Sequence, residues 1–186
     1  MADQTSRSAA RTAALVAVPV ALLAGLVAFW GLNRTPGSPG PALPSVQATG
    51  PVTMAAPTLP EDTAVACRAL LSQLPAALRD RPRRPVTAGA EQNAAYGDPP
   101  ITLACGAGPR PSIAPTADLL VLNNVCWYET DDSDGTTWYP IDRVVSVTVH
   151  LPPAYQPAAQ WAIEFSNPVG GSIRALTDVP TGCKDG

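Results

Sequence analysis

The sequence predicts an α+β fold: a mainly antiparallel sheet with a helix at each end of the domain, preceded by one transmembrane helix and a disordered linker. Three observations predict it. An uncharged apolar run lies near the N-terminus, a proline-rich stretch follows, and the remainder combines helical patterns with short β-type runs. We therefore expect a cytoplasmic tail (1–12), a transmembrane signal anchor (13–32), a linker (33–60) and an extracytoplasmic domain (61–186).

The apolar run from Ala13 to Leu32 is long enough to cross a bilayer. At about 1.5 Å per residue, a helix of this length reaches the roughly 30 Å thickness of the hydrocarbon core. Trp30 would lie at the headgroup level. A cleaved signal peptide is the alternative, because Arg7 and Arg11 form a basic region, but its apolar segment usually runs only about 7–15 residues.

Charge and cysteine usage predict a single-pass membrane protein with its N-terminus in the cytoplasm and its C-terminal domain outside. Two arginines precede the apolar run and only Arg34 follows it closely, as the positive-inside rule requires. The expected partner of residues 13–32 is thus the lipid bilayer. All the cysteines follow the run, and an even number in an external domain predicts two disulfides rather than reduced thiols. These cysteines are Cys67, Cys105, Cys126 and Cys183.

Residues 33–60 are expected to form a semi-extended spacer. They include seven prolines, three glycines and no aromatic residue, so they cannot bury enough apolar surface to fold.

The domain is predicted to begin with a helix after Pro60. Glu61 and Asp62 suit a helix start, and Pro75 ends the pattern. Apolar residues recur at i, i+3, i+4 and i+7, which marks one buried face. They are Cys67, Leu70, Leu71 and Leu74.

Strands and a second helix are predicted to follow. The β-rich runs are 101–105, 118–123, 125–130, 136–141 and 144–151. In the last run Val145, Val147, Val149 and Leu151 share one face, while Val144, Ser146, Thr148 and His150 share the other. Residues 131–135 form a hairpin loop. A short helix begins near Pro157, carries Trp161 and Phe165, and stops before Pro168.

No cofactor, metal or catalytic set is expected. Asp132-x-Asp134-Gly135 imitates part of a calcium loop but lacks its first and last ligands. Gly170-Gly171-Ser172 departs from a nucleophile elbow because Arg174 replaces the final glycine. His150 has no nearby zinc ligand and lies in a strand.

The basic stretch from Arg79 to Arg84 is the most unusual local composition of the domain. Its arginines could clamp a carboxylate or phosphate with Tyr96 and Asp98. The alternative is a solvated connection, because charge runs are usually solvated. The candidate ligand or partner residues are therefore Arg83, Arg84, Tyr96 and Asp98.

These residues resemble a family of actinobacterial membrane-anchored proteins classed as a domain of unknown function. The resemblance covers Glu61 to about Ser166 and implies an anchor and an extracytoplasmic α+β domain, but no activity. It also implies the disulfide pairing Cys67–Cys105 and Cys126–Cys183, one of three connectivities. The segments that carry it are Cys67 with Leu70 to Pro75, Arg83-Arg84, Ala94 to Pro99, Leu103 to Gly106, and Val125-x-Trp127.

Net charge argues against a nucleic-acid reader, because 12 basic and 15 acidic residues give −3 rather than a basic balance. Two functions remain. The first is a non-catalytic binding module of the cell envelope, with an envelope protein or cell-wall component as partner. The second is an envelope enzyme or small anionic-ligand receptor that uses the Arg79–Arg84 cluster with Tyr96 and Asp98.

Overall fold

The computed structural model describes residues 22–23, 25–29, 48–114 and 116–183, and the chain divides into one unit of residues 1–46 and another of residues 47–186. In the first unit, residues 22–23 and 25–29 are helical and exposed. Among all described residues, no helix is both long and apolar enough to cross a membrane. The predicted tail, most of the predicted anchor and residues 33–47 of the predicted linker lie outside the described residues.

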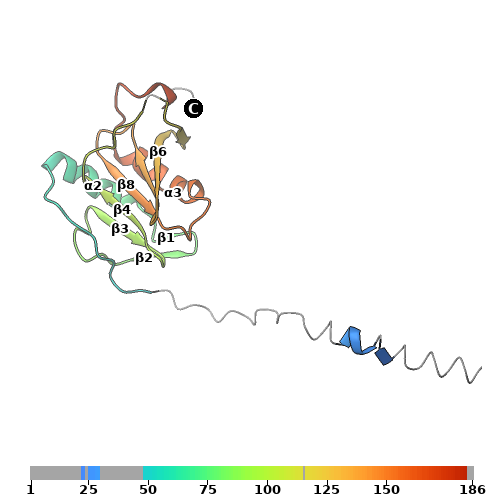
Figure 1. Ribbon diagram of the computed structural model, residues 1–186. Coiled ribbons are helices and arrows are strands. Elements are labelled where there is room, and N and C mark those ends of the chain that lie inside the picture. The colour runs from blue at the N-terminus through green and yellow to red at the C-terminus, as the bar shows by residue number, and fades with distance from the viewer. Residues whose placement is uncertain (1–21, 24, 30–47, 115, 184–186) are drawn as a thin grey trace, which may run out of the picture. The chain divides into compact units, whose positions relative to one another are not determined.

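The second unit is a single antiparallel sheet with two α-helices (Figure 1), which confirms the predicted class; α2 precedes the strands in the sequence and α3 follows them. The sheet order is β1-β2-β3-β4-β8-β7-β6-β5, and every ladder between neighbouring strands is antiparallel. The elements are α2 (Glu61–Gln73), β1 (Ala77–Leu78), β2 (Arg81–Arg84), β3 (Asn93–Tyr96), β4 (Ile101–Cys105), β5 (Leu119–Leu122), β6 (Val125–Asp132), β7 (Gly135–Pro140), β8 (Val147–Leu151), α3 (Ala159–Ser172) and the 3₁₀ turn η1 (Thr181–Cys183).

One face of the sheet forms the core. In β8, Val147, Val149 and Leu151 are buried while Thr148 and His150 are partly exposed, as the alternation predicts. The ladders continue the buried face across the sheet, because neighbouring residues in register share a face. One such row is Leu103, Val149 and Trp138, from β4, β8 and β7.

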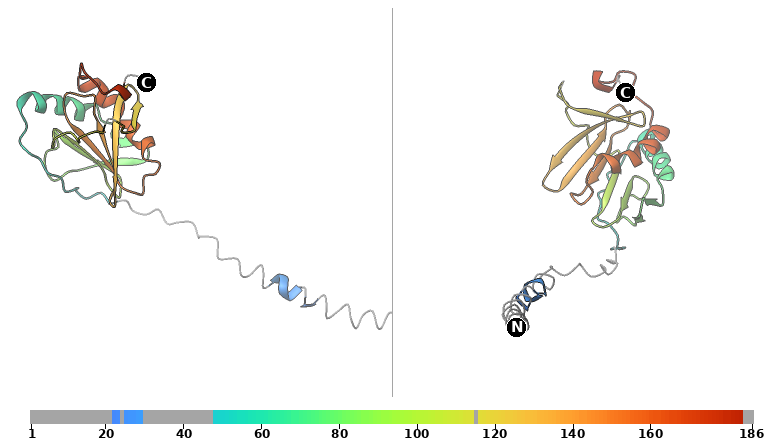
Figure 2. Two further views of the ribbon diagram at one scale, coloured as in Figure 1. Left: turned by 45° about the horizontal axis from the view of Figure 1, so that its top comes forward. Right: turned by 90° about the vertical axis from the view of Figure 1, so that its right-hand side faces the viewer.

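Both helices cover this face, as the two views of Figure 2 show. The disulfide between Cys67 and Cys105 joins α2 to β4. On α3, the Ser166 hydroxyl accepts a hydrogen bond of 3.0 Å from the indole of Trp127 on β6. The helices also pack against each other, so the core lies between one helical layer and one sheet.

The predicted end of the second helix was wrong. We expected it to stop before Pro168, but α3 continues to Ser172 with that proline inside it. A proline in a helix removes one backbone donor. Here Pro168 and Val169 are buried, and the Ile173 amide donates to the Val169 carbonyl at 2.9 Å. Burial of this last turn offsets the lost hydrogen bond.

The first three strands were missed by the sequence analysis. It predicted no strand before residue 101, yet Arg81–Arg84 form β2 and Tyr96 lies in β3. Pro82 lies in β2, and proline normally argues against a strand away from the edge of a sheet. The short β1 and β2 lie at one side of the sheet, where charge and proline are tolerated.

The linker prediction needs a correction for residues 48–60. Val52 is buried and forms an isolated parallel bridge with Val86. Further along, the Asn93 side-chain amide donates to the Ala55 carbonyl at 2.9 Å. Composition indicated a chain that could not fold alone, but it did not show that the folded domain would hold this segment by its backbone.

The hairpin between β6 and β7 is tighter than the expected loop of residues 131–135. Asp132 pairs with Gly135 in the ladder, so only two residues turn the chain. Gly135 has φ of 141°, and a Cβ there would collide with the Leu151 carbonyl oxygen. Glycine is therefore required where β7 begins beside the end of β8.

The predicted disulfide pairing is confirmed, and loss of the first bridge should cost more stability than loss of the second. Replacing Cys67 and Cys105 together by alanine should lower the free energy of unfolding by about 2–5 kcal/mol. Both side chains are 0% exposed, so the variant also leaves a core cavity. Urea unfolding followed by tryptophan fluorescence measures the change.

The matched control replaces Cys126 and Cys183 by alanine. This bridge spans 57 residues against 38 for the first, so chain entropy alone would make its loss slightly more costly. A greater loss of stability in this control would contradict a dominant role for core packing. Peptide mapping without reduction that linked Cys67 to Cys126 would contradict the pairing itself.

Candidate functional site

Arg84, the best placed of the predicted ligand-binding arginines, binds backbone carbonyls. Its guanidinium donates to the Gly50 carbonyl at 2.8 and 3.1 Å and to the Gly97 carbonyl at 2.9 Å. It also lies 3.9 Å from the Asp98 carboxylate. Arg84 therefore joins the extended segment near residue 50 to the loop after β3.

Arg83 and Tyr96 are direct partners in the β2–β3 ladder, so the structure brings the four predicted residues close together. Tyr96 is fully buried, and its hydroxyl donates to the Pro75 carbonyl at 2.9 Å. Burial raises the pKa of Tyr96, and the charge of Arg83 partly opposes this. The phenol thus ties the sheet to the end of α2.

The other two arginines of the stretch contact aromatic rings. The guanidinium of Arg79 lies 4.8 Å from the ring centre of Trp161, and that of Arg81 lies 5.9 Å from the ring centre of Tyr155. Arg79 also pairs with Glu164 at 3.4 Å. These contacts attach the β1–β2 hairpin to α3 and to the loop before it.

An open cleft of about 520 Å³ lies beside the β6–β7 hairpin. Glu129, Asp131 and Asp132 line it from β6, and Trp138 lines it from β7. The segment 153–159, which leads into α3, also lines it. We call this site the acidic cleft.

The register of the sheet explains why this cleft is acidic. Glu129 pairs with Trp138, so it lies on the same face as the core residues of β7 and β8. Asp131 pairs with Thr136 and continues that face toward the hairpin. The face that is apolar under the helices becomes acidic beyond the start of α3.

Burial raises the pKa of Glu129 from its ordinary value, and repulsion from Asp131 raises it further. The Asp131 carboxylate accepts a hydrogen bond of 2.8 Å from the Thr136 hydroxyl. No lysine or arginine is among the described residues that line the cleft. The cleft therefore carries negative charge without a cation of its own.

The indole of Trp138 lies buried at the edge of the cleft. Its side chain is 1% exposed, and its Nε1 has no hydrogen-bond partner among the described residues. The neighbouring indole of Trp127, by contrast, donates to Ser166. The Trp138 Nε1 atom is itself closed to solvent, and a buried polar group without a partner costs about 1–3 kcal/mol.

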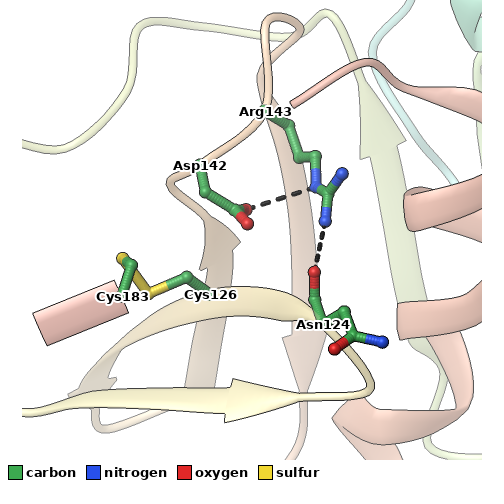
Figure 3. Close-up of a disulfide and its surroundings, with 5 residues drawn as sticks. All are labelled: Asn124, Cys126, Asp142, Arg143 and Cys183. Atoms are coloured by element: carbon green, nitrogen blue, oxygen red, sulfur yellow. Dashed lines mark hydrogen bonds and ion pairs between the residues drawn. A yellow bond between two sulfur atoms is a disulfide. The ribbon is translucent and has the colours of Figure 1, made fainter. Parts of the chain in front are cut away.

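A second polar site is built around Asp142 and Arg143, which are paired at 3.3 Å and both buried (Figure 3). The Arg143 guanidinium also donates to the carbonyls of Asn124 and Ile173. An open hollow of about 450 Å³ lies beside the pair. Arg143 connects the β5–β6 turn, the end of α3 and the segment after β7.

The motifs set aside in the sequence analysis have structural roles. The Asp132 carboxylate accepts hydrogen bonds from the amides of Asp134 and Gly135 and so closes the hairpin turn. His150 Nδ1 lies 3.2 Å from the Thr137 hydroxyl. Ser172 is the last residue of α3, not the turn of a nucleophile elbow. The described residues contain no group of three or more metal-ligating side chains arranged for a metal.

The sequence analysis did not identify Glu129, Trp138, Asp142 or Arg143. A usable signal existed for Glu129, because the period of two in residues 125–130 places it on the face of Val125 and Trp127. An acidic residue in that row predicts a polar site at the border of the core. Asp142 and Arg143 gave no such signal, since they follow a strand as an ordinary charged pair.

Comparison with known proteins identifies a family whose function is unknown. A family model described as "Protein of unknown function (DUF3515)" matches residues 16–176. Nothing matches among curated proteins or among solved structures.

Replacing Glu129 by glutamine should stabilise the fold at neutral pH. The raised pKa means that the folded state holds this proton to higher pH than the unfolded state, so stability falls as the pH rises above the ordinary value of 4.5. The glutamine amide stays neutral at every pH, so the variant does not lose this part of its stability. Thermal unfolding at pH 4 to 8 should show a gain that is largest near neutral pH and shrinks toward acid. A variant less stable than the native protein at pH 7 would contradict the electrostatic account.

Replacing Arg143 by methionine should lower the free energy of unfolding by about 3–5 kcal/mol, because it leaves Asp142 as an unpaired buried charge. Urea unfolding measures the loss. Arg174→Met is the matched control, since that arginine is exposed and its replacement removes an equal charge while Asp142 keeps its partner. Equal losses in both variants would show that the buried ion pair contributes no more to the free energy of unfolding than an exposed arginine does.

Proposed function

The chain belongs to the DUF3515 family of proteins of unknown function, and from this premise we propose that it is a membrane-anchored, extracytoplasmic binding module of the cell envelope. We also propose an actinobacterial source. Abundant alanine, proline and arginine with a single lysine, Lys184, supports a genome of high GC content.

The observation that carries the external location is the state of the cysteines. All four are paired, and neither pair involves neighbouring residues in the sequence. Structural disulfides form and persist in oxidising compartments and are rare in the cytosol. The buried bridge between Cys67 and Cys105 also lies inside the core, where a structural role fits better than a redox cycle.

The proposed anchor is the uncharged run of residues 13–32, whose length suits the lipid bilayer. The arginines before it support a cytoplasmic N-terminus. The proposed linker is then limited to residues 33–47, because the segment from residue 48 is bound to the folded unit.

Binding is better supported than catalysis. The groups that most resemble catalytic or anion-binding residues are engaged in structural contacts, such as Arg84 with two carbonyls and His150 with Thr137. The acidic cleft, in contrast, is lined by Glu129, whose carboxylate forms no ion pair within the described part of the chain. We propose that it receives part of an envelope protein or cell-wall component.

The alternative of an enzyme or anionic-ligand receptor built on Arg83, Arg84, Tyr96 and Asp98 is less well supported. A ligand would have to compete with the carbonyl contacts of Arg84, and the Tyr96 hydroxyl already donates inside the core.

Cysteine labelling in intact cells tests the proposed location. In the full-length protein, Ser45→Cys should react with a membrane-impermeant maleimide, whereas Ser6→Cys should react only after permeabilisation. The four native cysteines should resist alkylation until a reductant is added.

Labelling of Ser6→Cys in intact cells would contradict the orientation, and alkylation of the native cysteines without a reductant would contradict the external domain. Loss of an N-terminal epitope tag from the mature protein would indicate that residues 13–32 belong to a cleaved signal peptide and not to an anchor.

A further inference from the structure

We propose that the bridge between Cys126 and Cys183 is a redox-sensitive latch. A dithiol reductant opens this bridge while the domain stays folded. Opening releases residues 177–183 from the sheet and uncovers apolar side chains of β5. This inference goes beyond the proposed binding function and does not depend on it.

The two bridges of the domain differ in exposure. Cys67 and Cys105 are both 0% exposed, so a reductant reaches that bridge only when the core opens. Cys126 is 2% exposed, whereas Cys183 is partly exposed at the end of η1 (Figure 3). Thiol–disulfide exchange requires access to a sulfur atom. Only the second bridge has a partly exposed residue from which a thiolate can approach.

The C-terminal segment is held to the domain mainly by this disulfide. The Leu176 amide donates to the Asp142 carbonyl at 2.7 Å, and Ala175 forms an isolated bridge with Arg143. These contacts fix the chain as far as Leu176. Beyond it, no backbone hydrogen bond and no ion pair joins residues 177–183 to another described part of the chain. Breaking the disulfide therefore frees this segment without breaking a ladder of the sheet.

The held segment lies on the face of the sheet opposite the helices. Alternation along β6 places Cys126 on the face opposite Trp127, which lies in the core. Cys126 pairs with Val121 in the ladder, and Leu119 lies two residues earlier on β5, so all three share that face. A Cβ on Gly182 would lie 3.2 Å from Leu119 Cδ1, so η1 contacts this leucine directly.

Release of the segment exposes apolar surface at the border of the sheet. β5 is the last strand in the sheet order, and its residues Leu119–Leu122 are all apolar and already partly exposed. Native proteins commonly protect an apolar edge strand by covering it with another segment. Here η1 is such a cover, and the disulfide keeps it in place. The redox state of the bridge thus sets how much apolar surface β5 presents.

The opening reaction is a thiol–disulfide exchange in two steps. A thiolate of the dithiol attacks the sulfur of Cys183, the bond to Cys126 breaks, and Cys126 leaves as a thiolate that takes up a proton. The second thiol of the reductant then attacks the mixed disulfide, which releases Cys183 as a thiol and leaves the reductant as a disulfide. The reductant supplies both electrons, and the domain gains two thiols.

The test follows both bridges in the full-length protein in detergent micelles. The protein is equilibrated with mixtures of reduced and oxidised dithiothreitol, free thiols are trapped with a maleimide, and the labelled peptides are identified by mass spectrometry. Cys126 and Cys183 should be half labelled at a ratio of reduced to oxidised reagent about tenfold or more below the ratio that Cys67 and Cys105 require. Opening the buried bridge also costs the packing of the core, which opening the second does not.

Hydrogen exchange measures what the opened bridge releases. At a ratio that opens only the second bridge, we expect faster amide exchange in residues 177–183 and in β5, and unchanged exchange in α2 and β4. The double variant Cys126→Ser with Cys183→Ser is a permanently open form and should show the same pattern without a reductant. Asp178→Asn is the matched control, since it changes an exposed side chain of the same segment and keeps the bridge.

Three outcomes overturn the proposal. Equal ratios for the two bridges would show that the second bridge is no easier to open than the first. Unchanged exchange in residues 177–183 after opening would show that the disulfide does not hold the segment. Tryptophan fluorescence of the double variant equal to that of the unfolded protein would show that the bridge supports the whole domain. None of these outcomes depends on where the protein lies in the cell, so a failure here is distinct from a failure of the labelling experiment.

Discussion

The folded unit depends on a sheet with one apolar face that two helices cover. Residues that are paired in register on neighbouring strands share this face, as Leu103, Val149 and Trp138 do. The bridge between Cys67 and Cys105 fastens α2 to the middle of it. Because both helices cover the same face, the end of the helical layer decides where the core ends and where the acidic cleft begins.

A chain rich in proline needs side-chain donors for its backbone carbonyls. Proline has no N–H, so the 22 prolines of the sequence reduce the number of backbone donors. In the structure, Tyr96 donates to the Pro75 carbonyl, Tyr155 to the Pro99 carbonyl, and Gln92 to the Pro57 carbonyl. The arginines act in the same way, which accounts for a basic stretch that binds the chain itself.

The parts that the sequence predicted well are those fixed by local pattern. The face of α2 and the alternation of β8 follow directly from apolar spacing, and both are buried as expected. The parts that it missed depend on distant contacts. The arginines of β2 look solvated until residues 48–55 and the loop after β3 are in place. Likewise, Pro168 ends a helix only when no tertiary burial offsets the lost hydrogen bond.

The acidic cleft escaped prediction for a related reason, since it is formed by paired strands together with a distant part of the chain. Glu129 and Trp138 are opposed in the β6–β7 ladder, so the register places the carboxylate beside the core. Burial and the charge of Asp131 raise the pKa of Glu129. The alternation of β6 gives the face on which Glu129 lies, but the segment 153–159, which lines the cleft with it, follows much later in the sequence. A local pattern can therefore place one residue of such a cleft, but not the walls around it.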